Sequence, residues 1–112
     1  MFTEKKFKTV AIIGGGLIGS SLAHSIRENH LCDNLRIFDS KTDVRKKLKE
    51  IFSSHEICEN LNETVTEADL VFLCVPVGSM RDLAKKISNL LKKGCILTDT
   101  GSTKNSVIKD IQ

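Results

Sequence analysis

The segment TVAIIGGGLIGS, residues 9–20, decides the fold of this chain. Its first five residues are apolar or β-branched, which is typical of a strand buried on both faces of a sheet. The glycine pattern Gly-x-Gly-x-x-Gly follows at once, and residues 17–29 then carry apolar side chains at helical spacing. A strand, a glycine turn and a helix in this order form the context in which the pattern indicates a dinucleotide-binding site.

The rest of the 112-residue chain repeats this alternation of apolar runs and helical periods. We expect further strands at residues 35–39, near 57–58, at 70–75 and at 95–99, with helices between them and a last helix over 103–111. Such alternation predicts right-handed crossovers between parallel strands. The predicted fold is therefore α/β, a Rossmann-type doubly wound parallel sheet with strand order 3-2-1-4-5 in three α/β/α layers. We expect one dinucleotide-binding domain over residues 1–112.

Composition and charge exclude several classes of protein. Hydrophobic residues make up 40% and charged residues 28%, values that are ordinary for a soluble globular domain. The net charge is +3 and the aromatic residues are five Phe, which argues against a groove that stacks nucleic-acid bases. A membrane span needs about 20 apolar residues in a row, and no run in the chain approaches this length. We expect a cytoplasmic protein that binds neither nucleic acid nor a membrane.

Four cysteines stand too far apart in the sequence for a Cys-x-x-Cys pair. The N-terminal residues also show no signal peptide, which indicates a reducing compartment. We therefore interpret the cysteines as small buried apolar residues and predict no metal site.

Each glycine of the motif has its own predicted role. Gly14 permits a tight turn from strand to helix, Gly16 lets the backbone approach a pyrophosphate, and Gly19 lets the helix pack closely on the strand. The amides of Leu17 and Ile18 then point at the phosphates from the positive end of the helix.

Asp39 ends the predicted second strand, 20 residues after Gly19. Its carboxylate can accept hydrogen bonds from both hydroxyls of an adenosine ribose. A carboxylate at this place repels the 2′-phosphate of NADP, so NAD is the favoured cofactor. The positive charge of Lys41 can partly offset this repulsion, so NADP is not excluded. A Walker phosphate loop is excluded because no Gly-Lys-Ser/Thr follows the turn, and the loop also differs from that of methyltransferases that bind S-adenosylmethionine.

Three stretches together resemble one family: GGGLIGSSLA at 14–23, ADLVFLCVPV at 68–77 and DTGSTK at 99–104. They are similar to the N-terminal NAD(P)-binding domain of prephenate/arogenate (cyclohexadienyl) dehydrogenases, and the resemblance covers about residues 9–108. The last stretch is the most specific, because it keeps all four fixed positions of the family's Asp-x-Gly-Ser-x-Lys.

The resemblance implies an oxidoreductase of tyrosine biosynthesis. In that family NAD(P) accepts a hydride from C4 of the substrate ring, which loses CO₂ as it becomes aromatic. Val75 and Pro76 match residues that line the cofactor cleft beside the nicotinamide ribose. Ser102 matches the serine near the nicotinamide and the ring hydroxyl, and we predict it as the catalytic residue; it is also a candidate for capping the last helix.

The family's catalytic histidine and its helical substrate and dimerisation domain follow the part that this chain matches. The three histidines do not match the catalytic position: His24, His30 and His55. We expect no arginine to hold the substrate carboxylate, because all four lie on predicted helices or the second strand, away from the strand ends. The chain is thus predicted to hold the cofactor without turning over prephenate or arogenate, and to form a homodimer only with the missing domain. The alternative is a non-catalytic NAD-binding module or a truncated gene product.

Overall fold

The computed structural model describes residues 7–99 and 106–108. The strands are β1 (Phe7–Ile13), β2 (Cys32–Phe38), β3 (Leu70–Leu73), β4 (Ile96–Asp99) and β5 (Ser106–Ile108). The helices are α1 (Leu17–Glu28), α2 (Thr42–Ile51), α3 (Leu61–Val65), α4 (Val77–Ser88) and the short 3₁₀ helix η1 (Ser54–Glu56). In the part of the chain that is described, no helix is long and apolar enough to cross a membrane.

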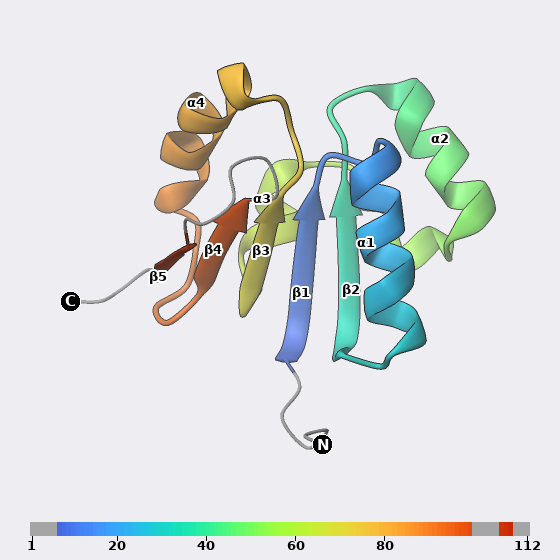
Figure 1. The fold of residues 1–112 in the computed structure, drawn as a ribbon, viewed down its shortest axis with the longest axis horizontal. Coiled ribbons are helices and arrows are strands. Elements are labelled where there is room, and N and C mark those ends of the chain that lie inside the picture. Colours follow the sequence, from blue (N-terminus) through green and yellow to red (C-terminus); the bar gives the residue numbers. More distant parts are fainter. Residues whose placement is uncertain (1–6, 100–105, 109–112) are drawn as a thin grey trace.

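The sheet has five strands in the order β2-β1-β3-β4-β5. The first four are parallel, and their carboxyl ends meet at the upper edge in Figure 1. The predicted Rossmann-like α/β architecture is confirmed, and so is the order of the four parallel strands within it. The α1 helix begins at Leu17, immediately after the glycine turn, as predicted.

The central strand β1 is buried on both faces. Val10 and Ile12 pack into a cluster with side chains of α1 and α2, whereas Ala11 and Ile13 pack into a second cluster with side chains of α3 and α4. All four are at most 3% exposed. The helices therefore cover both faces of the sheet and form the three predicted layers.

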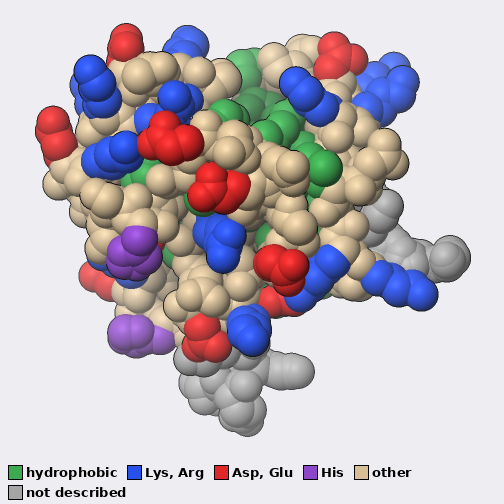
Figure 2. Space-filling model, turned by 180° about the vertical axis from the view of Figure 1, so that it is seen from behind, with side chains coloured by type: hydrophobic (Ala, Val, Ile, Leu, Met, Phe, Trp, Pro, Cys, Tyr) green, Lys and Arg blue, Asp and Glu red, His purple; other side chains and the backbone are tan. Residues whose placement is uncertain are grey.

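Charged side chains of both signs are interspersed over the rear of the molecule, on the face that Figure 2 shows. Hydrophobic side chains gather in a hollow near the upper edge of that face, the edge at which the parallel strands end. On this face the charged side chains form no patch of a single sign.

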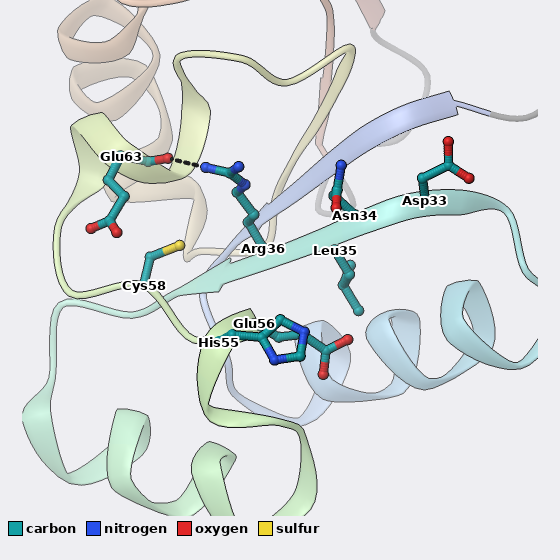
Figure 3. A pocket seen from close by; sticks show the side chains of 8 residues that line it. All are labelled: Asp33, Asn34, Leu35, Arg36, His55, Glu56, Cys58 and Glu63. Carbon is teal, nitrogen blue, oxygen red and sulfur yellow. Dashed lines mark hydrogen bonds between the residues drawn. The ribbon is translucent and has the colours of Figure 1, made fainter.

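The predicted third strand is reduced to a single bridge, so the order 3-2-1-4-5 is wrong at this edge. Ile57 pairs with Ile37, and the Cys58 amide donates to the Ile37 carbonyl at 2.8 Å. The residues just before Ile57 form η1 instead of a strand, because a capping box between Ser53 and Glu56 stabilises a helical turn there. The short helix α3 covers the rest of this edge, since Arg36 of β2 donates to the Glu63 carbonyl at 2.9 Å (Figure 3).

The other edge also departs from the prediction. Residues 106–108 form β5, which pairs antiparallel with β4 through Ile96 and Ile108, where we expected part of a helix. The sequence Ser-Val-Ile is rich in β-branched side chains, which favour a strand that can pair with an open sheet edge. The rest of the expected 103–111 helix lies outside the described residues.

Asp69 joins three segments at the amino ends of the strands. Its Oδ2 accepts from the Thr9 amide at 2.9 Å and the Lys8 amide at 3.1 Å, and its Oδ1 lies 2.7 Å from Lys92 Nζ. Desolvation by itself would raise the pKa of Asp69, but the hydrogen bonds from Lys92 and the two amides outweigh it and hold the pKa below its ordinary value. The ionised carboxylate therefore stabilises the fold.

Replacing Asp69 with Asn should lower the free energy of unfolding at pH 7 by about 1–3 kcal/mol, because hydrogen bonds to a charged acceptor are lost. The folded-state pKa is depressed, so this stabilisation is present above the unfolded pKa of about 3.9 and is lost as the pH falls below it. Urea titrations at several pH values measure the difference between the two proteins. It should shrink on acidification, whereas Glu50→Gln, at an exposed position of α2, should cost little; a difference independent of pH would contradict this role.

Candidate cofactor-binding site

The turn between β1 and α1 requires glycine at position 14. Gly14 has φ +105°, a backbone conformation that residues with a Cβ rarely adopt. A Cβ here would collide with the carbonyl oxygen of Cys74, which follows the end of β3. The Gly14 amide donates to the Phe38 carbonyl at 2.7 Å, so the turn is held between the ends of β2 and β3.

Packing requires glycine at position 19 and leaves little space for a side chain at position 15. A Cβ on Gly19 would collide with the Gly14 carbonyl oxygen, which is the close contact of helix and turn that the sequence predicts. A Cβ on Gly15 would lie 2.5 Å from Leu48 Cδ1 of α2. The sequence pattern indicates no role for Gly15, because its constraint comes from a helix more than 25 residues away in the chain.

Gly16 differs from the other three glycines. A Cβ added to it would have no other described atom within 4 Å, and its φ of −73° suits any residue. Neither internal packing nor backbone conformation therefore requires glycine at this position. The open space in front of Gly16 is what the approach of a pyrophosphate needs.

A groove of about 380 Å³ opens beside Gly16 at the carboxyl ends of β1 and β3. Its lining contains most of the residues predicted to bind the cofactor: Gly16, Leu17, Ile18, Gly19, Val75 and Pro76, together with Cys74. Leu17 is 85% exposed and Ile18 60% exposed, so two large apolar side chains lie together beside the groove. The structure thus brings these residues together, and their contact with a cofactor stays a prediction.

Asp39 ties the glycine turn to the end of β2. Its Oδ2 accepts from the Gly15 amide at 2.9 Å, and its Oδ1 accepts from the Lys41 amide at 2.8 Å. A carboxylate oxygen can accept more than one hydrogen bond, so both oxygens keep capacity for ribose hydroxyls. Asp39 therefore shapes the turn in addition to the ribose role that its position predicts.

Arg45 lies at the end of β2, which contradicts our expectation that every arginine is remote from the strand ends. Its Nη1 donates to the Asp39 carbonyl at 2.7 Å, and its guanidinium carbon lies 5.6 Å from the centre of the Phe38 ring. Its Nε lies 3.5 Å from Glu59 Oε1. The sequence could have indicated the contact between Arg45 and Asp39, because an Arg in the first turns of a helix can reach back to the end of the preceding strand.

Glu59 receives a second cation from α2. Lys49 Nζ donates to Glu59 Oε2 at 2.8 Å. This hydrogen bond and the charges of Lys49 and Arg45 hold the pKa of Glu59 below its ordinary value. Glu59 is therefore ionised at neutral pH.

A separate pocket of about 240 Å³ lies along the outer edge of β2, between η1 and α3 (Figure 3). Cys58 lines it, and burial raises the pKa of this thiol against the opposing hydrogen bond to Thr64. His55 also lines this pocket, while His24 packs on the Phe52 ring. The described residues include no group of three or more side chains that could hold a metal ion.

Ser102, the predicted catalytic residue, lies outside the described residues. The described part of β4 ends at Asp99, at the same edge of the sheet as the groove. Its contacts stay a prediction.

A family model described as "Prephenate dehydrogenase, nucleotide-binding domain" matches residues 22–112. The chain belongs to this family. The resemblance that the three sequence motifs indicated is therefore confirmed.

Two curated relatives agree with the family assignment. The chain is 41% identical over 106 residues to a cyclohexadienyl dehydrogenase of Zymomonas mobilis, which covers 95% of the chain and 36% of the relative. It is 36% identical over 106 residues to a prephenate dehydrogenase of Lactococcus lactis, covering 91% of the chain and 28% of the relative. The chain thus spans about a third of the length of these two relatives.

A solved structure is also similar. The prephenate dehydrogenase of Aquifex aeolicus, in complex with hydroxyphenyl propionate and NAD⁺, superposes with a TM-score of 0.73 at 26% sequence identity. The match covers 82% of the chain and 32% of that protein.

Alanine substitutions should divide the glycines into two groups. Gly14→Ala and Gly19→Ala should each lower the free energy of unfolding by at least about 2 kcal/mol, because of the backbone collisions described above. Gly16→Ala should change it by less than about 0.5 kcal/mol, because its Cβ meets no other atom. Thermal and urea unfolding measure these changes. Equal losses at all three positions would show that Gly16 serves the fold as well.

Proposed function

We propose that this chain binds NAD as the cofactor-binding domain, residues 1–112, of a prephenate/arogenate (cyclohexadienyl) dehydrogenase. The observation that carries the proposal is the contrast at the glycine turn. Three of the four glycines are explained by collisions within the protein, while Gly16 faces open space in the groove. A pyrophosphate that approaches the backbone closely accounts for a glycine there.

The pyrophosphate would bind at the N-terminus of α1. This helix has 12 residues and begins directly after Gly16. Its first turn lies wholly within the described residues and has neither a side-chain cap nor an acidic residue. Its first amides, including those of Leu17 and Ile18, therefore remain for an anion at the positive end of the helix.

The adenosine ribose would lie against Asp39. The carboxylate is already held by the Gly15 and Lys41 amides, so it is positioned before the cofactor arrives. Its negative charge favours the ribose hydroxyls of NAD over the 2′-phosphate of NADP. NADP is the weaker alternative.

The nicotinamide would lie toward Val75 and Pro76, with Ser102 beside it. When bound, NAD supplies the hydride acceptor for oxidation of the substrate ring. The family resemblance assigns Ser102 to the ring hydroxyl of prephenate or arogenate. We propose that the substrate arginine, the catalytic histidine and the homodimer contacts belong to the family's helical domain, and that the protein works in the cytoplasm without a nucleic-acid or membrane partner.

Calorimetric titration of the chain should give tighter binding of NAD than of NADP. Asp39→Ala should weaken NAD binding by about 10- to 100-fold, the equivalent of charge-assisted hydrogen bonds of about 1.5–3 kcal/mol, and should narrow the preference. The matched variant Asp43→Ala removes the same charge from the exposed first turn of α2 and should leave the preference intact. Equal affinity of the unmodified chain for both dinucleotides would contradict this use of Asp39.

Binding should also separate the glycines. Gly16→Ala should remain folded, with an unchanged circular dichroism spectrum, and lose most of its affinity for NAD. If Gly16→Ala binds NAD as tightly as the unmodified chain, the proposed function fails.

The purified chain mixed with NAD and either substrate should produce no NADH absorbance above background. Hydride transfer requires a substrate carbon held about 3–3.5 Å from the acceptor, together with a positioned base for the ring hydroxyl. A serine hydroxyl has too high a pKa to act as that base unaided. Steady turnover that is lost in Ser102→Ala would contradict this prediction.

A further inference from the structure

We propose that Glu59 determines the preference for NAD over NADP by holding Arg45 away from the adenosine ribose. This inference rests on the proposed dinucleotide site. It concerns two residues outside the glycine motif, on α2 and in the loop between η1 and α3. Glu59 acts through Arg45 and is therefore a positioning residue.

The end of β2 carries two groups with opposite preferences. A carboxylate at this place accepts the ribose hydroxyls of NAD, whereas an arginine nearby accommodates the 2′-phosphate of NADP. This chain has both, since Asp39 ends the strand and Arg45 contacts the Asp39 carbonyl at 2.7 Å. Which cofactor is favoured therefore depends on whether the guanidinium is available to a phosphate.

The contacts of Arg45 show that its guanidinium is already engaged. Nη1 donates to the Asp39 carbonyl, Nη2 donates to Thr42 Oγ1 at 3.4 Å, and Nε faces Glu59. The planar group also lies over the Phe38 ring, and the side chain is only 15% exposed. All three nitrogens thus face protein groups.

Glu59 is the one charged partner among these contacts, and it is itself held in place. Its second oxygen binds Lys49 at 2.8 Å, one helical turn further along α2. Glu59 bridges two cations of α2 and offsets the positive charge that α2 would otherwise present beside the ribose. The remaining contacts of Arg45 are to neutral oxygens, which compete poorly with a phosphate dianion for a guanidinium.

Removing the charge of Glu59 should therefore free Arg45 for a 2′-phosphate. In Glu59→Gln we expect NADP to bind at least about fivefold more tightly, since charge-assisted bonds from a guanidinium to phosphate are strong. NAD affinity should change less than about twofold, because NAD has only a neutral hydroxyl at the 2′ position, which binds a guanidinium far more weakly than a phosphate dianion does. Calorimetric titration with NAD and NADP measures both affinities. Titration with 5′-AMP and adenosine 2′,5′-bisphosphate measures the affinity for the adenosine half of each cofactor alone.

Two controls separate this mechanism from other effects of charge. Glu28→Gln removes the same charge from the far end of α1 and should leave the ratio of NAD to NADP affinity unchanged. Adding Arg45→Gln to Glu59→Gln should abolish the gain for NADP. A gain that persists in the double variant would come from the freed Lys49 or from the loss of direct repulsion by Glu59, and either would overturn the role of Arg45.

The outcomes also distinguish this inference from the proposed function. If the unmodified chain binds no dinucleotide, the proposed function fails. If it binds NAD and Glu59→Gln leaves the ratio unchanged, the proposed function stands and the inference about Glu59 is wrong.

Discussion

The close approach of α1 to the end of β1 is the constraint on which the site depends. Gly19 packs against the carbonyl of Gly14, and Gly14 packs against the carbonyl of Cys74, with no room for a Cβ at either contact. Because β1 is buried on both faces, it cannot shift to relieve a larger side chain. The first amides of α1 are therefore fixed over the carboxyl ends of β1 and β3, where Val75 and Pro76 form the facing wall of the groove.

Charged groups add a second constraint at the end of β2. Asp39 binds the amides of Gly15 and Lys41, and Arg45 binds the Asp39 carbonyl. Glu59 joins Arg45 to Lys49, so these charges are largely paired within the protein. A preorganised carboxylate costs less to position when a ligand binds. The same contacts that stabilise the end of β2 thus prepare the proposed ribose site.

The two ends of the parallel sheet have different roles. At the amino ends, Asp69 joins β1, β3 and the turn before β4. Among the described residues, those that line the groove all lie at the opposite edge of the sheet. At the carboxyl ends, glycines and exposed apolar side chains leave the backbone open to a ligand. Asp69 therefore stabilises the edge opposite the proposed site, so its substitution should alter stability with little effect on ligand binding.

The amino-acid sequence by itself determined the features that depend on local pattern and chemical type. The double-sided burial of β1, the start of α1 at Leu17 and the place of Asp39 all follow from residues within a few positions of one another. The order of the four parallel strands follows from the alternation of strands and helices along the chain and from the right-handed crossover rule. The family motifs are equally local, and the comparisons confirm them. These predictions succeeded because short periodicities and glycine spacing directly limit the backbone.

Only the tertiary structure decided how distant segments meet. The third strand became a single bridge because the Ser53–Glu56 capping box and the Arg36–Glu63 contact occupy that edge. Residues 106–108 became a strand because β4 offers them hydrogen bonds. The constraint on Gly15 from Leu48, and the place of Arg45 between Asp39 and Glu59, likewise depend on how α2 packs beside β2. A side chain's partners across such distances are set by packing and register, which no local pattern of residues encodes.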